Sequence, residues 1–178
     1  MNNRISNKEF ENVIDAIDSH KAQIFNKLSV MLTDVIKKAM RKGIPEAYTN
    51  KTKYASMENP QPGQFIVQIV KSMNSLNKVI SNMLHEETRK VIFTSVFPFF
   101  IDEIEQFVDQ HFIDDSNEEG FEIFKHDLEY LEKEITELAK NISTGQAFIH
   151  KIREIQEADL QDFEMEEEED EDESDGKP

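Results

Sequence analysis

The chain has 178 residues, 38% of them hydrophobic, which suffices for one domain with a core but not for two independent cores. It contains no cysteine, so disulfides, thiolate zinc sites and a cysteine nucleophile are excluded. No stretch has the apolar run of a signal peptide or the roughly 18 consecutive apolar residues of a membrane span, which predicts a soluble cytosolic or nuclear protein.

The net charge of −17 is unevenly distributed. Residues 162–178 hold 11 acidic side chains and one lysine, a net of −10. Residues 1–90 carry 14 basic against 9 acidic side chains, a net of +5, and residues 91–161 carry 5 against 17, a net of −12. This balance leaves no broad basic face and argues against a duplex nucleic-acid partner. The excess of +5 could serve an anionic membrane, an acidic protein segment or solvation alone.

The first helix is predicted from a capping box at Ser6 to Glu9, with Ile5 and Phe10 at the two hydrophobic staple positions. It ends before Gly43 and Pro45, giving about 35 residues and a length of about 50 Å, a rod more than a ball. Its apolar residues keep helical spacing: Phe10, Val13, Ile14, Ile17, Ile24, Phe25, Leu28, Met31, Leu32, Val35, Ile36 and Ala39.

Residues 43–62 form a polar connector that ends in Pro60-Gln61-Pro62-Gly63. Tyr48, Tyr54 and Met57 within it are expected to dock on the bundle or, alternatively, to contact a partner.

Residues 60–112 are expected to form two helices joined by a tight corner at Leu84-His85-Glu86, the second of them central in a bundle. The first stripe is Phe65, Ile66, Ile69, Met73, Leu76, Ile80, Met83 and Leu84. The second, wider face is Val91, Ile92, Val96, Phe97, Phe100, Ile101, Ile104, Phe107, Val108 and Phe112. Pro98 should kink the second helix or begin a new segment near Thr94.

A second capping box, Ser116 to Glu119, is predicted to open a helix whose stripe is Phe121, Phe124, Leu128, Leu131, Ile135, Leu138 and Ile142. After a break at 141–145, where Ser143 and Gln146 could form a third cap, a short helix holds Phe148, Ile149, Ile152 and Ile155. No stretch alternates with period two. We therefore expect an all-α, elongated helical bundle of long helices lying side by side over residues 1–158, and a disordered acidic tail over 159–178.

Metal sites are poorly supported. Asp115, Asn117, Glu119 and Gly120 imitate the opening of a calcium-binding EF-hand loop, but the position of the bidentate glutamate holds His126. The histidines at 20, 85, 111, 126 and 150 are scattered and form neither HExxH nor a di-iron pattern. An inter-helix loop with a cap explains the same residues and is the favoured interpretation.

No catalytic constellation is present, and we expect no catalytic, cofactor-binding or metal-ligating residue and no enzyme. The run Val96 to Phe100 holds three phenylalanines within four positions, which a helix cannot place on one side. Phe99 should lie off the main stripe and is a weak candidate for a partner contact.

The segment Asn59-Pro60-Gln61-Pro62-Gly63-Gln64-Phe65, followed by Leu76, Leu84-His85-Glu86-Glu87 and Val91-Ile92-Phe93, carries a family likeness. It resembles the C-terminal domain of the Vps-fifty-four-type subunit of the GARP (Golgi-associated retrograde protein) tethering complex. The stretch Lys27-Leu28-Ser29-Val30-Met31-Leu32 also resembles that family's preceding helix. The likeness covers roughly residues 20 to 140.

The resemblance implies a non-catalytic helical rod acting in retrograde transport from endosomes to the trans-Golgi network. Implied partners are other tethering subunits and endosomal or Golgi membrane proteins, with SNAREs engaged through an N-terminal part that this chain lacks. The implied location is cytoplasmic, peripheral at the trans-Golgi network and endosomes. The chain is far shorter than the family's subunits, and the acidic tail has no counterpart in the resemblance.

Two further hypotheses belong to other classes. The acidic tail and the acidic second half suggest a chaperone that binds basic proteins such as histones. An enzyme is the third, although no residue set names its reaction.

Overall fold

Helices make up the computed structural model, which describes residues 7–41, 48, 61–113 and 117–159. The elements in chain order are α1 (Asn7–Arg41), α4 (Gln64–Ser81), α5 (Glu86–Val108), the π-helix η1 (Asp109–Ile113), α6 (Glu118–Ala139) and α7 (Ser143–Glu157). No β-strand occurs within those ranges, so the predicted all-α class is confirmed. None of the helices described there has the length and apolar content needed to cross a bilayer.

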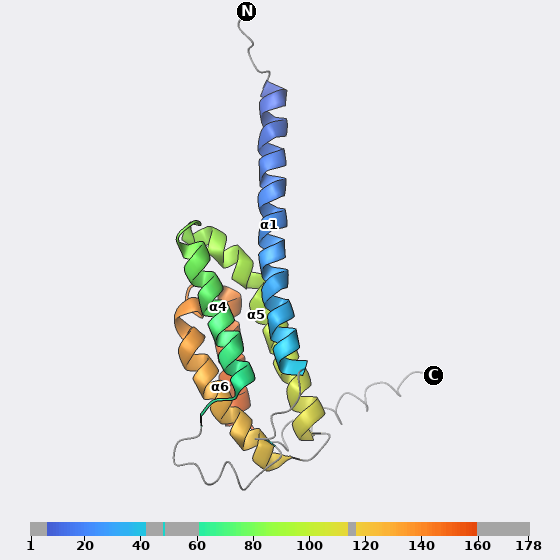
Figure 1. Ribbon diagram of the computed structural model, residues 1–178, viewed down its shortest axis with the longest axis vertical. Coiled ribbons are helices and arrows are strands. Elements are labelled where there is room, and N and C mark those ends of the chain that lie inside the picture. The colour runs from blue at the N-terminus through green and yellow to red at the C-terminus, as the bar shows by residue number, and fades with distance from the viewer. Residues whose placement is uncertain (1–6, 42–47, 49–60, 114–116, 160–178) are drawn as a thin grey trace, which may run out of the picture.

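The molecule is elongated because α1 extends well beyond the other helices (Figure 1). The C-terminal half of α1 packs on α5 and α4, α6 packs on α7 and α4, and α5 packs on α7. The bundle therefore forms around one half of α1, while the other half stands clear of it.

Helix α1 has the predicted length of 35 residues. Its capping residue Ser6 and staple residue Ile5, and the terminating Gly43 and Pro45, lie outside the described residues. Lys38 and Arg41 occupy the last turn, where the helix dipole favours cations.

The corner between α4 and α5 is where the sequence placed it. Helix α4 ends at Ser81, His85 is the N-cap of α5, and Glu86 and Glu87 occupy the first turn of α5. The two helices diverge from this corner, however, and each packs more extensively on other helices than on its sequence neighbour (Figure 1). The buried stripe of α4 lies instead against α1 and α6.

Three positions of the predicted stripes require correction. Met83 and Val91 flank the corner and are 77% and 57% exposed, because the chain turns away from the core there. Phe93, which the predicted stripe omitted, is fully buried. A helix that contacts neighbours on several sides buries residues beyond a single stripe.

Pro98 does not begin a new segment. Helix α5 runs continuously from Glu86 to Val108, with Pro98 inside it on an exposed side. The ribbon of α5 changes direction part-way along its length (Figure 1), which fits the local bend that an internal proline causes by removing one backbone donor.

Aromatic rings fill much of the core. Near the bundle end where α4 begins, Phe107 packs on Phe112 and Phe124 with ring centroids 5.7 and 5.1 Å apart. Nearer the middle of α5, Phe148 of α7 stacks on Phe100 at 5.2 Å and packs on Phe97 at 5.4 Å. The second half of the chain is therefore held together mainly by apolar burial.

The starts of α6 and α7 differ from the predicted capping boxes. Asn117 caps α6, its side-chain oxygen accepting from the Gly120 amide at 3.0 Å, while Ser116 lies outside the described residues. Ile142 is the N-cap of α7, without a side-chain hydrogen bond, and α7 begins at Ser143 inside the predicted break. The Gln146 amide instead donates to the Lys140 carbonyl at 2.8 Å.

Of the three connector residues expected to dock, Tyr48 is 2% exposed and lies in the core. Tyr54 and Met57 lie outside the described residues, as does the tail from residue 160 onward that the sequence predicts to be disordered.

Candidate interaction surface

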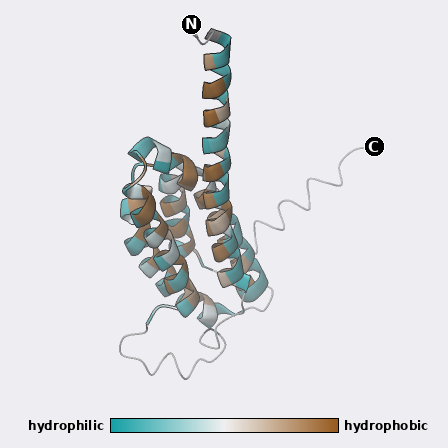
Figure 2. Ribbon diagram, turned by 45° about the horizontal axis from the view of Figure 1, so that its top comes forward, coloured by the Kyte–Doolittle hydropathy of each residue, from teal (hydrophilic) through white to brown (hydrophobic). Residues whose placement is uncertain are grey.

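Helix α1 carries large apolar side chains that the bundle does not cover. Phe10, Val13, Ile14, Ile17 and Ile24 are 60%, 55%, 43%, 50% and 54% exposed. Figure 2 shows hydrophobic turns along the part of α1 that rises above the bundle. The side-by-side packing expected from the sequence therefore extends along the C-terminal half of α1 only.

The C-terminal half of α1 is held by a different face of the helix. Leu32, Ile36, Ala39 and Met40 are each at most 5% exposed, and the Ser29 hydroxyl donates to the Ile92 carbonyl of α5 at 2.9 Å. This face packs on α5 and α4.

Helix lengths explain why the other half is uncovered. Helix α1 has 35 residues, whereas α4 has 18 and α5 has 23. At 1.5 Å per residue these correspond to about 53, 27 and 35 Å. The partner helices are too short to follow α1 to its N-terminus.

The uncovered residues follow a strict heptad pattern. Spacings of four and three alternate from the first position to the last, and we call this set the heptad stripe: Phe10, Ile14, Ile17, Lys21, Ile24, Leu28, Met31 and Val35. Met31 is 62% exposed, and Leu28 and Val35 are half-buried beside the bundle. Alternating four and three spacing sustained over more than three heptads is typical of a coiled-coil seam.

Lys21 is the one charged member of the heptad stripe. Its ammonium forms an ion pair with Asp18 at 3.1 Å, and both side chains are exposed, at 60% and 64%. An exposed pair of this kind contributes little stability by itself.

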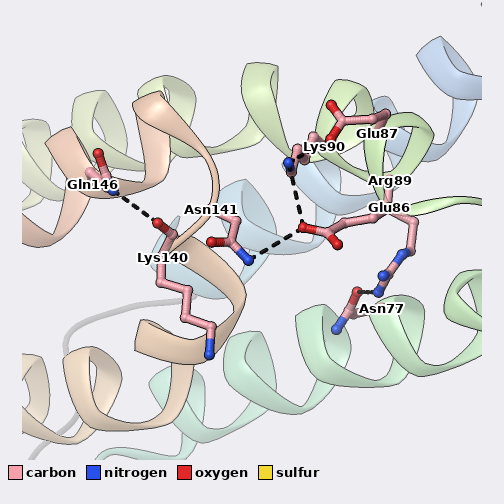
Figure 3. A network of polar contacts seen from close by, with 8 residues as sticks. All are labelled: Asn77, Glu86, Glu87, Arg89, Lys90, Lys140, Asn141 and Gln146. Atoms are coloured by element: carbon pink, nitrogen blue, oxygen red, sulfur yellow. Dashed lines mark hydrogen bonds and ion pairs between the residues drawn. The ribbon is translucent and has the colours of Figure 1, made fainter.

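A network of polar contacts links the α4–α5 corner to the α6–α7 corner (Figure 3). The Asn141 amide donates to the Glu86 carboxylate at 3.3 Å, and Lys90 pairs with the same carboxylate at 3.4 Å. Arg89 donates to the Asn77 side chain at 3.4 Å. These contacts surround a hollow of about 190 Å³, and the buried Arg89 Nε has no hydrogen-bond partner among the described residues. The network joins the two corners.

Asp127 of α6 is the most enclosed carboxylate among the described residues, at 1% exposure. The Tyr48 hydroxyl donates to one of its oxygens, and the backbone amide of Gly63, the N-cap of α4, donates to the other at 2.7 Å. Burial raises the pKa of Asp127, and the hydrogen bonds from Tyr48 and Gly63, together with nearby His126, oppose that rise. The carboxylate joins the connector to α4 and α6.

The residues that imitate a calcium loop serve as a helix cap. Besides capping α6, Asn117 donates from its side-chain amide to the Tyr48 carbonyl at 3.2 Å. Asp115 lies outside the described residues.

The histidines do not converge. His85 is the N-cap residue of α5 but makes no side-chain cap hydrogen bond. His111 lies edge-on to Phe107 with ring centroids 4.7 Å apart, and His126 and His150 face Glu129 and Glu154 on their own helices. Within the described ranges no three histidine or carboxylate side chains gather as metal ligands would.

Phe99 is half-buried, whereas its neighbours Phe97 and Phe100 are fully buried. It therefore lies off the main stripe of α5, at the edge of the core. Its part in partner binding stays a prediction.

The sequence identified the apolar residues of α1 but did not indicate that the bundle leaves half of them uncovered. The usable signals were the strict heptad spacing and a helix much longer than its neighbours.

No protein-family model matches the chain, and no curated protein or solved structure does either.

Proposed function

We propose that the chain is a non-catalytic interaction domain whose protruding helix α1 binds another α-helix through the heptad stripe. The observation that carries this proposal is the exposure of Phe10, Ile14, Ile17 and Ile24 at seam positions of a helix that stands clear of its own bundle. Exposed apolar surface of this regularity marks an interaction site.

We further propose that this domain acts in vesicle tethering, as a subunit or fragment of a GARP-type complex in retrograde transport from endosomes to the trans-Golgi network. The resemblance over residues 59–93 supports this role. An all-helical, elongated fold with a projecting helix suits a protein that holds a partner at a distance. Other tethering subunits and membrane proteins of endosomes and the Golgi are the partners it would engage, at the cytoplasmic face of those membranes.

Membrane flotation tests the tethering role. The purified chain is mixed with isolated endosomal and Golgi membranes, and we expect it to float with them. Ile17→Asp and Ile24→Asp should abolish flotation, because a carboxylate at a seam position must be desolvated in the bound state. Ser19→Asp and Asn26→Asp, exposed residues on the opposite side of α1, are matched controls and should float normally. A wild-type chain that stays entirely in the soluble fraction would contradict the tethering role.

The second candidate is a chaperone for basic proteins, favoured by the net charges of −12 over residues 91–161 and −10 over 162–178. Histone binding that weakens with salt and disappears on deletion of residues 162–178 would support it. Histone binding that survives the deletion would assign the activity to the folded domain instead.

A further inference from the structure

We propose that the helix bound by the heptad stripe is α1 of a second copy of the chain, paired antiparallel. The inference rests on the proposed function in its coarser form, that the stripe binds a helix. Charge and residue pairing along the stripe identify which helix.

A membrane surface is a poor occupant for the stripe. Residues 7–24 carry four acidic and two basic side chains, so the protruding half of α1 has a net charge of −2. Helices that lie on membranes place lysine and arginine on their polar face to attract anionic lipid. The strict heptad spacing favours a helical partner as well, since lipid imposes no such period.

A parallel pair of copies is disfavoured by Lys21. In a parallel, in-register coiled coil each seam residue faces its own copy. Lys21 would then face Lys21 in the middle of the seam, with two like charges drawn out of water.

An antiparallel pair matches apolar residues on both sides of the centre of the seam. Setting Ile14 opposite Ile24 of the second copy also sets Phe10 opposite Leu28, and it places Ile17 opposite Lys21. Because the arrangement is two-fold symmetric, each of these pairs occurs twice. The overlap covers the exposed residues of the stripe from Phe10 to Ile24 on both copies.

The same arrangement provides a partner for the charged position. The two-fold axis passes near residue 19, and Lys21 of one copy comes to lie beside Asp18 of the other, on the same side of the seam. The Lys21–Asp18 ion pair, 3.1 Å within one chain, becomes a cluster of two ammonium and two carboxylate groups around the axis. Lys21, the only charged residue of the stripe, therefore lies beside an oppositely charged side chain of the second copy in the antiparallel orientation and not in the parallel one.

The arrangement is also compatible with the bundles. The face of α1 that packs on α5 and α4 is turned about a quarter of a revolution from the heptad stripe, at 100° per residue. The two bundles then lie at opposite ends of the paired helices, with about 30 Å between the packed halves of α1 at 1.5 Å per residue.

Mass measurement by light scattering tests the pairing on the full chain. We expect a mass twice that of the 20.8 kDa chain. Ile24→Asp, which places a carboxylate opposite Ile14, should give the monomer mass, and Ser19→Asp the dimer mass. Because Ile24 is 54% exposed, the variant should keep the helical content and melting temperature of the bundle at low concentration. A wild-type chain that is monomeric at 100-fold the concentration used in flotation overturns the pairing.

Charge exchange tests the orientation. Lys21→Asp alone places four carboxylates at the axis and should give monomers, whereas Lys21→Asp combined with Asp18→Lys restores the cluster and should restore the dimer. A double variant that stays monomeric, or a single variant that stays dimeric, contradicts the antiparallel arrangement.

Spin labels measure the orientation directly, because the chain has no cysteine of its own. Labels at Ser19→Cys, on the outer side of each helix, should lie across the axis from each other with almost no displacement along it. Labels at Asn26→Cys should be displaced along the axis by about 21 Å, from about 14 residues at 1.5 Å each. Equal distances for the two labels would indicate a parallel pair and overturn the inference.

Failure of this inference differs from failure of the proposed function. A monomeric chain that floats with membranes through its heptad stripe refutes self-pairing and leaves tethering standing. A dimer that does not float supports self-pairing and counts against tethering.

Discussion

Asp127 combines burial with two hydrogen bonds that join separate parts of the chain. Its carboxylate accepts from the Tyr48 hydroxyl and the Gly63 amide while 1% of the residue is exposed. Sequence reasoning expected Tyr48 to dock but gave no sign that Asp127 would receive it, because acidic residues are abundant in this chain and carry little positional information.

Removal of the Asp127 side chain should be costly. Asp127→Ala removes the acceptor of the Tyr48 hydroxyl and of the partly buried Gly63 amide, and we expect the free energy of unfolding to fall by about 2 kcal/mol or more in urea denaturation. Asp127→Asn is the control. Its amide can accept from Gly63 and donate to the Tyr48 oxygen, so it should stay within about 1 kcal/mol of wild type at neutral pH. Equal losses for both variants would contradict the assigned hydrogen bonds.

The contribution of Asp127 to stability should depend on pH in the direction expected for a carboxyl group whose pKa is raised on folding. Because the pKa of Asp127 is raised on folding, the folded chain binds the proton more tightly than the unfolded chain. Its contribution to stability is therefore largest below the unfolded pKa of about 3.9 and is lost as pH rises through the folded pKa. Stability measured against Asp127→Asn isolates this group from the other carboxylates. The free energy of unfolding of wild type should rise relative to that of Asp127→Asn as pH falls. A relative rise with increasing pH would contradict the raised pKa of Asp127.

At the scale of single elements, the helix caps predicted at the starts of α6 and α7 differ in the structure. Asn117 caps α6 through Gly120 and also holds the Tyr48 carbonyl, whereas Ser143 is the first residue of α7 and makes no side-chain cap bond. We expect Asn117→Ala to lower the free energy of unfolding by about 1 to 2 kcal/mol. Ser143→Ala should change it by less than about 0.5 kcal/mol. Chemical denaturation of the two variants side by side checks both values, and the reverse order would restore the capping box at Ser143.

Gly145 is a position where helix propensity and packing give opposite expectations. Alanine is favoured over glycine in a helix by about 1 kcal/mol. A Cβ at Gly145, however, would come within 2.7 Å of the Ala139 carbonyl oxygen and 2.9 Å of its Cα. We expect Gly145→Ala to destabilise the chain by about 1 to 3 kcal/mol in thermal unfolding. A rise in melting temperature would mean that α6 and α7 can separate at little cost.

At the scale of the whole molecule, the protruding half of α1 contributes little to the bundle. Deletion of residues 1–24 removes Phe10, Ile14, Ile17 and Ile24, all largely exposed. In dilute solution, where copies do not associate, the melting temperature should be nearly unchanged. Ile36→Ala is the contrast: this fully buried side chain of the same helix should cost about 2 to 5 kcal/mol when truncated. A large loss on deletion would show that the N-terminal half has a partner within its own chain.

Sequence alone determined the helices and most of their ends. The length of α1, the corner at His85 and the apolar stripe of α6 followed from residue spacing, turn residues and caps, which act within one or two helical turns. The starts of α6 and α7 were misplaced because several neighbouring polar residues could each cap a helix, and only the packed chain selects among them.

Only the tertiary structure decided which apolar surfaces are covered. The spacing of Ile17 and Ile36 along α1 is equally helical, yet one is half exposed and the other fully buried. The difference depends on how far α4 and α5 extend and on their divergence after the corner, which local spacing does not encode. Burial is a property of the space around a helix, so the free heptad stripe became visible only when its neighbours were in place.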